Sequence, residues 1–130
     1  MEVIKDLAIL VARICISSVF IWAAFEKLIN WSGTVDYVKQ KNIPYAALAL
    51  PLAIAIQIFG GLSLLLGYQI RIGALILILF IVTAAIRFHD FWNLEGSVRT
   101  LEKTLFMKDV AIFGSLIMIL VMGGGRFCLN

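Results

Sequence analysis

Four long apolar segments constrain the fold of this 130-residue chain more than any other feature of its sequence. A helix that crosses a bilayer needs about 20 mostly apolar residues, because it rises about 1.5 Å per residue and the hydrocarbon layer is about 30 Å thick. Four segments meet this requirement: residues 7–28, 45–66, 72–91 and 106–123. The pattern predicts a single polytopic membrane domain that covers residues 1–130.

The composition excludes an ordinary soluble domain. Hydrophobic residues make up 62% of the chain and charged residues only 15%, whereas a typical soluble domain carries about 25% charged residues. A small soluble domain has too much surface to be covered by so apolar a chain. The high apolar content also excludes disorder, and two cysteines are too few for a disulfide scaffold.

The apolar segments predict helices, because the strands of a membrane barrel alternate apolar and polar residues and these segments do not. Backbone groups in lipid must find their hydrogen bonds within the segment, as a helix provides. The expected architecture is an all-α bundle of four transmembrane helices. The first segment is too long for a cleaved signal peptide and contains Arg13, so we expect it to be retained as a helix.

Two polar residues lie well inside the predicted spans. Arg13 is about 9 Å into the first span by the helical rise, and Gln57 is near the middle of the second. A charge at the centre of a lipid-facing helix costs about 2.5 to 3.5 kcal/mol, so such residues usually face the bundle interior. A contact between Arg13 and Gln57 is one interpretation. The other is that Arg13 reaches to the near interface while Gln57 joins two helices by hydrogen bonds.

A second set of charges is expected at the opposite membrane face, where the first and third helices end and the fourth begins. An up-and-down bundle brings these ends together, and tryptophans flank them. With the two residues above, they form the candidate ligand-binding set: Arg13, Trp22, Glu26, Lys27, Gln57, Arg87, His89, Asp90, Trp92 and Lys108. Asp109 lies beside Lys108 in the first turn of the fourth predicted span. The alternative is the aromatic belt with flanking charges that many membrane proteins show.

Several chemistries are excluded by the residues present. The single histidine rules out a bis-histidine haem within one chain, and no Cys/His cluster or C-x-x-C motif predicts a metal or dithiol site. No basic stripe indicates nucleic acid. The sequence names no catalytic residue and no evident cofactor, so whether the protein is an enzyme stays open.

Small residues at intervals of seven in the second span, Ala46, Ala53, Gly60 and Gly67, predict close approach of a neighbouring helix.

The order of these residues resembles the DoxX family of small bacterial membrane proteins, in the following positions: Arg13, Phe20, Trp22, Ala23, Glu26, Lys27, Leu28, Gln57, Gly60, Gly61, Gly67, Arg71, His89, Asp90, Phe91, Trp92, Lys108, Asp109, Gly125 and Arg126. The resemblance implies a four-helix, multi-pass protein of the bacterial inner membrane. Some relatives are linked to a thiosulfate:quinone oxidoreductase or to membrane redox complexes that handle oxidative stress. This chain departs from the family in having Gln57 where Glu is common, and Cys128 has no support in the family pattern.

Two functions follow as hypotheses. The first is a redox-linked or quinone-associated accessory subunit, in which Arg13 and Gln57 orient the head of a small apolar ligand while Glu26, His89 and Asp90 handle protons. Because no electron carrier is visible in the chain, it would act with a soluble redox protein or a bound organic cofactor, a quinone being compatible.

The second hypothesis is a non-catalytic scaffold or assembly factor that docks a soluble partner through residues 31–43 or 93–104. We expect both segments to be loops, and the mixture of apolar and charged residues in the first would equally suit a loop that rests on the bilayer surface. Contact with the lipid bilayer is expected in either case. Homo-oligomerisation stays open, and a transporter would require it.

Overall fold

The structure is a computed structural model that describes residues 1–129. Its helical elements are α1 (Glu2–Ile29), α2 (Trp31–Gln40), α3 (Ala46–Leu66), α4 (Ile70–Phe88), the 3₁₀ turn η1 (Phe91–Asn93) and α5 (Gly96–Met122). No strand occurs in this described part of the chain. Four of the elements, with η1 continuing α4, are long and apolar enough to cross a membrane. The predicted all-α, four-span fold is confirmed.

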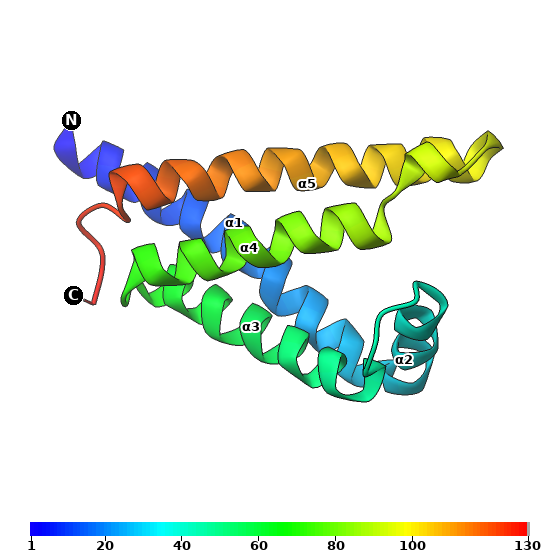
Figure 1. The fold of residues 1–130 in the computed structure, drawn as a ribbon. Helices are drawn as coiled ribbons and strands as arrows, with labels where there is room; N and C mark the ends of the chain where they lie inside the picture. The colour runs from blue at the N-terminus through cyan, green and yellow to red at the C-terminus, as the bar shows by residue number, and fades with distance from the viewer. Residues whose placement is uncertain (130) are drawn as a thin grey trace.

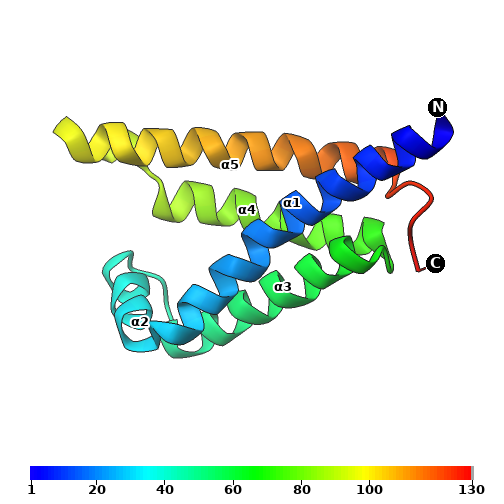
Figure 2. The same cartoon turned by 180° about the vertical axis from the view of Figure 1, so that it is seen from behind.

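The four long helices pack in the order α1, α3, α4 and α5 (Figure 1). Helix α1 crosses the others at an angle, running from the end where α5 finishes toward the end where α3 begins (Figure 2). Both views place the two chain termini at one end of the bundle and α2 at the other. We call these the terminal end and the α2 end.

Two helices extend beyond the predicted spans. Helix α1 begins at Glu2, and α5 begins at Gly96, ten residues before the predicted span that starts at 106. Counting apolar residues finds only the lipid-facing part of a helix, whereas the backbone hydrogen bonds continue through polar turns. The 27 residues of α5 extend about 40 Å, more than the hydrocarbon layer requires.

The segment 31–43, expected to be a loop, contains helix α2. Helix α2 packs on α3 and buries Val38, while Trp31, Tyr37 and Lys39 stay exposed. Its one apolar face suits a position at the membrane interface.

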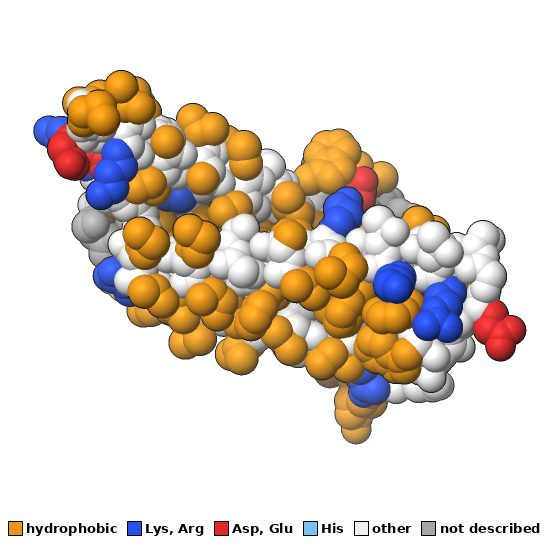
Figure 3. Space-filling view, turned by 90° about the horizontal axis from the view of Figure 1, so that it is seen from above, with side chains coloured by type: hydrophobic (Ala, Val, Ile, Leu, Met, Phe, Trp, Pro, Cys, Tyr) orange, Lys and Arg blue, Asp and Glu red, His pale blue; other side chains and the backbone are white. Residues whose placement is uncertain are grey.

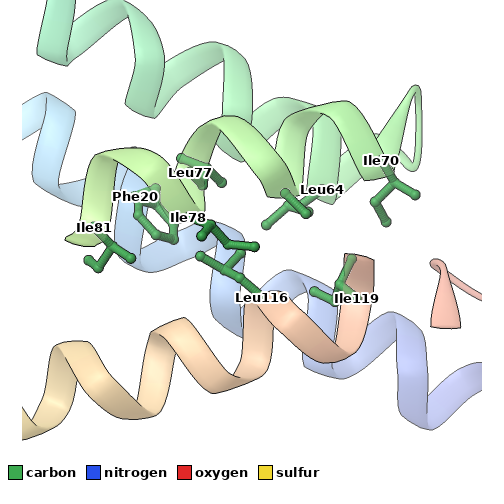
Figure 4. Close-up of a cluster of buried hydrophobic side chains, with 9 residues drawn as sticks. Phe20, Leu64, Ile70, Leu77, Ile78, Ile81, Leu116 and Ile119 are labelled. Atoms are coloured by element: carbon green, nitrogen blue, oxygen red, sulfur yellow. The ribbon is translucent and has the colours of Figure 1, made fainter. Parts of the chain in front are cut away.

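The main hydrophobic core joins all four long helices. Helix α4 contributes most of it, since it packs between α3 and α5 (Figure 4). The cluster consists of Phe20, Leu64, Ile70, Ala74, Leu77, Ile78, Ile81, Leu116 and Ile119. Outside this core, hydrophobic side chains cover much of the surface, and on the face drawn in Figure 3 charged side chains gather toward the ends. This surface is suited to contact with lipid.

Glycines let the helices approach closely along α3. A Cβ atom on Gly60 would lie 2.6 Å from Cγ of Leu77 in α4, and one on Gly61 would lie 2.8 Å from Cγ1 of Ile21 in α1. The predicted close packing at Gly60 is confirmed. Gly61, outside the seven-residue register, does the same for a second neighbour. Two adjacent glycines thus let α3 pack tightly between α1 and α4.

Candidate functional site

Arg13 lies at the terminal end and is almost completely buried, with 1% of its surface exposed. Its guanidinium donates four hydrogen bonds to backbone carbonyls. Nε donates to Leu64 at 2.9 Å and Nη2 to Leu65 at 3.0 Å, both in the last turn of α3. Nη1 donates to Gly124 at 3.1 Å and Phe127 at 2.6 Å in the C-terminal tail. Arg13 therefore joins α1, α3 and the tail.

The position of Arg13 explains how a buried charge is tolerated without a carboxylate partner among residues 1–129. The last carbonyls of a helix have no partner within the helix, and the helix dipole places partial negative charge there. Helix α3 ends at Leu66, and Gly67 follows in the left-handed conformation with φ of +71°. A Cβ atom on Gly67 would lie 2.7 Å from Nη2 of Arg13, so glycine also makes room for the guanidinium.

The expected contact between Arg13 and Gln57 does not form. Antiparallel packing of α1 on α3 sets Arg13 beside Leu64, about two turns beyond Gln57 along α3. Gln57 is buried, and within residues 1–129 its Oε1 atom has no hydrogen-bond partner. The depth of each residue in its span follows from one helix alone, whereas the register between two helices depends on how they pack.

His89 lies at the α2 end, just after α4, and meets two carboxylates from α5. Its Nδ1 atom lies 2.7 Å from Oε2 of Glu102, and its Nε2 atom lies 3.6 Å from Oδ2 of Asp109. All three side chains are partly exposed, by 14 to 22%. A neutral imidazole donates from one nitrogen and a protonated one from both, so the protonated ring matches both carboxylates. We call these three residues the His89 cluster.

Glu102 was missed because the fourth span was predicted to begin at residue 106. Glu102 and Asp109 are seven residues apart, close to two helical turns, so they share one face of α5. A helix extended back to Gly96 would have revealed this spacing. The signal was present in the sequence but lay in the polar part of the helix.

A second ion pair, between Lys41 and Asp90, lies at the α2 end. Nζ of Lys41, just after α2, lies 3.1 Å from Oδ1 of Asp90. The other oxygen of Asp90, Oδ2, accepts a hydrogen bond from Nδ2 of Asn93 at 3.2 Å. Tyr37 of α2 stacks on Phe88 with ring centroids 5.4 Å apart. These contacts connect α2 to the end of α4 directly beside His89.

Two groups outside the spans have shifted pKa values. Burial raises the pKa of Tyr37, and the charges of Glu102 and Asp90 act in the same direction, whereas Lys41 opposes them. Burial alone would lower the pKa of Lys41, but its hydrogen bond to Asp90, with the nearby Tyr37, Asp90 and Glu102, raises it overall. The charges of α2, α4 and α5 are thus electrostatically linked at this end.

Three aromatic rings pack beside the His89 cluster. Phe91 and Trp92 of η1 lie edge to face with each other and with Phe106 of α5, at centroid distances of 5.4 to 5.8 Å. Arg99 and Lys103 place their charges within 5.9 Å of the Phe91 ring. Trp92 remains half-exposed, so this aromatic group presents a ring surface outward.

The remaining candidates lie at the same end but are not joined to the His89 cluster. Nε1 of Trp22 donates to Oε1 of Glu26 at 2.8 Å on the surface of α1. Half-buried Lys27 lines a shallow cavity of about 380 Å³ with Glu26, Asn30 and Thr34. Arg87 and Lys108 are exposed. In the described chain, neither Glu26 nor Lys27 makes a hydrogen bond or ion pair with His89 or Asp90.

No group of three or more His, Cys, Asp or Glu residues within residues 1–129 has a geometry that could hold a metal ion. The two described cysteines, Cys15 and Cys128, are free thiols.

These features define a small multi-pass membrane protein with a polar cluster at one face. The chain belongs to the DoxX family, whose model matches residues 8–90. It is 32% identical over 130 residues to the inner membrane protein YqjF of Escherichia coli K12, covering all of this chain and 95% of that protein. It is also 26% identical over 126 residues to the inner membrane protein YphA of the same strain, covering 97% and 90% of the two chains. No solved structure matches it.

These relatives and the four spanning helices identify the chain as a multi-pass protein of the bacterial inner membrane, in contact with the lipid bilayer. The family match ends at Asp90. Helix α5, with Glu102 and Asp109, lies beyond that match but inside the similarity to both relatives.

Proposed function

We propose that this protein is an accessory subunit of a membrane redox system and that it binds a quinone-class ligand at the α2 end. The observation that carries the proposal is the position of His89, which lies just after α4 and between Glu102 and Asp109. A histidine with an acid at each nitrogen can accept a proton on one side and release it on the other. The half-exposed ring of Trp92 offers an apolar surface for a flat ligand head.

In this proposal, this chain transfers protons and a partner protein supplies electrons. Reduction of a quinone to a quinol takes up two electrons and two protons. A partner redox protein supplies the electrons, and the His89 cluster transfers protons between the membrane face and the ligand. Arg13 is left out of this scheme, because its hydrogen bonds go to backbone carbonyls at the other end of the bundle.

Ligand binding is tested by thermal unfolding of protein purified in a mild detergent, with and without added decylubiquinone. We expect the quinone to raise the melting temperature of the wild type and to have a much smaller effect on His89→Gln. Lys39→Gln, an exposed change on α2, serves as the matched control and should respond like the wild type. Absence of any shift in the wild type, together with no quinone in its organic extract by mass spectrometry, would reject the proposal.

A scaffold function is the second candidate, favoured by α2. This helix is fixed to α4 through Tyr37 and Lys41, yet it exposes Trp31, Asp36 and Lys39 at the membrane face. Such a rigid, exposed helix suits docking of a soluble protein. If His89→Gln preserved a cellular phenotype while substitutions at Asp36 and Lys39 abolished it, the scaffold would replace the redox proposal.

A further inference from the structure

The C-terminal tail, residues 123–129, folds back across the terminal end of the bundle (Figure 1). Besides the two hydrogen bonds from Arg13, the tail is held by Leu129, whose N–H donates to the carbonyl of Leu66 at 3.2 Å. The N–H of Arg126 lies 3.4 Å from Oδ1 of Asp6. No tail residue belongs to the main core cluster. The tail is therefore held by hydrogen bonds and by the close contact of buried Gly124 with the bundle, and not by side chains of the core cluster.

The guanidinium of Arg13 divides its donors between two elements. Within residues 1–129, Nε and Nη2 donate to α3, and Nη1 donates to the tail. Loss of the Nη1 contacts would leave Arg13 still bound to Leu64 and Leu65. The tail can thus separate from Arg13 while α1 and α3 remain joined.

Glycines allow the tail to turn sharply and to pack closely against the bundle. Gly123 and Gly125 have φ values of +82° and +80°, which glycine adopts without strain. A Cβ atom on Gly124 would lie 2.6 Å from Cδ1 of Ile70 and 2.8 Å from Sγ of Cys128. The tail therefore turns sharply after α5 and then lies directly against the bundle.

We propose that residues 123–129 form a strap that is hinged at the three glycines, latched by Nη1 of Arg13, and able to open without unfolding of the four helices. When closed, it covers Arg13 and the end of α3. This device lies at the opposite end from the His89 cluster and does not depend on the proposed redox function.

The test measures how fast N-ethylmaleimide alkylates Cys128 in the detergent-purified protein. Cys15→Ser provides the background, so that Cys128 is the reporting thiol. Arg13→Lys keeps the positive charge but removes the planar fork of donors. Cys128 is half-buried in the closed tail, so we expect faster alkylation in Arg13→Lys, up to about tenfold for loss of a charged hydrogen bond of ordinary strength. Helix content by circular dichroism should remain unchanged.

A second variant changes a residue of the strap itself. Gly124→Ala places a Cβ against Ile70 and Cys128 and should also speed alkylation, whereas Gly114→Ala, which has open space around it, should not. Faster alkylation in both strap variants, with helix content retained, supports the proposal. Unchanged rates in both, or a rise that only accompanies loss of helix content, would overturn it.

Discussion

The two ends of the bundle differ in the burial and in the hydrogen-bond partners of their ionisable residues. At the terminal end, Arg13 is fully buried and bound to four backbone carbonyls. At the α2 end, His89, Glu102 and Asp109 are partly exposed and face one another's side chains. Backbone carbonyls cannot change protonation state, whereas carboxylates and imidazole can. Arg13 therefore has a structural role at the terminal end, whereas the side chains of the His89 cluster are ionisable groups in contact with one another.

The largest effect expected from this comparison is that of Arg13→Leu. The change removes four hydrogen bonds and leaves buried carbonyls of α3 and the tail without donors. We expect a loss of about 3 kcal/mol or more in the free energy of unfolding. Unfolding by a denaturing detergent measures it. Arg126→Gln, a nearby exposed arginine, is the control and should change stability little. A loss for Arg13→Leu no larger than that of the control would contradict a structural role.

Gln57→Leu should act in the opposite direction. Its buried Oε1 atom has no partner in the described chain, so an apolar side chain of similar size should raise stability by about 1 kcal/mol. Because Arg13 and Gln57 do not touch, the effects of Arg13→Leu and Gln57→Leu should add in the double variant. The same detergent unfolding measures both. A marked rescue of Arg13→Leu by Gln57→Leu would show that the two residues interact after all.

The sequence predicted the helical spans better than the contacts between them. The length of an apolar segment is a local property, so the four spans and their place in a membrane could be predicted from the sequence. The partners of Arg13 depend on where α1 meets α3, which glycines such as Gly61 decide through close packing. Glu102 was missed because polar turns extend α5 beyond the apolar span. Helix α2 was missed because its ten residues carry no spanning signal.

A double-mutant cycle at the α2 end tests whether the His89 cluster acts as a unit. His89→Gln and Glu102→Gln each replace one ionisable partner of the 2.7 Å contact with a neutral amide. We expect a coupling energy of about 1 kcal/mol in thermal unfolding near pH 6, because the two groups share a hydrogen bond in a partly buried place. A cycle of His89→Gln with Lys39→Gln should give none. Equal coupling in the two cycles would mean that the contact contributes nothing specific.

The smallest effect is expected for Lys41→Met, which breaks the ion pair with Asp90 and loosens α2. The pair is partly exposed, so the loss at neutral pH should be about 0.5 kcal/mol. The pKa of Lys41 is raised above its usual 10.5, so its contribution is complete below that pH and is lost as pH rises through the higher folded value. The melting-temperature difference between wild type and Lys41→Met should therefore hold from pH 7 to about 10 and shrink at higher pH. Because Tyr37 titrates in the same region, the comparison is made in a Tyr37→Phe background. A difference that stays constant through pH 11 would place the contribution of Lys41 in packing of its alkyl chain and not in its charge.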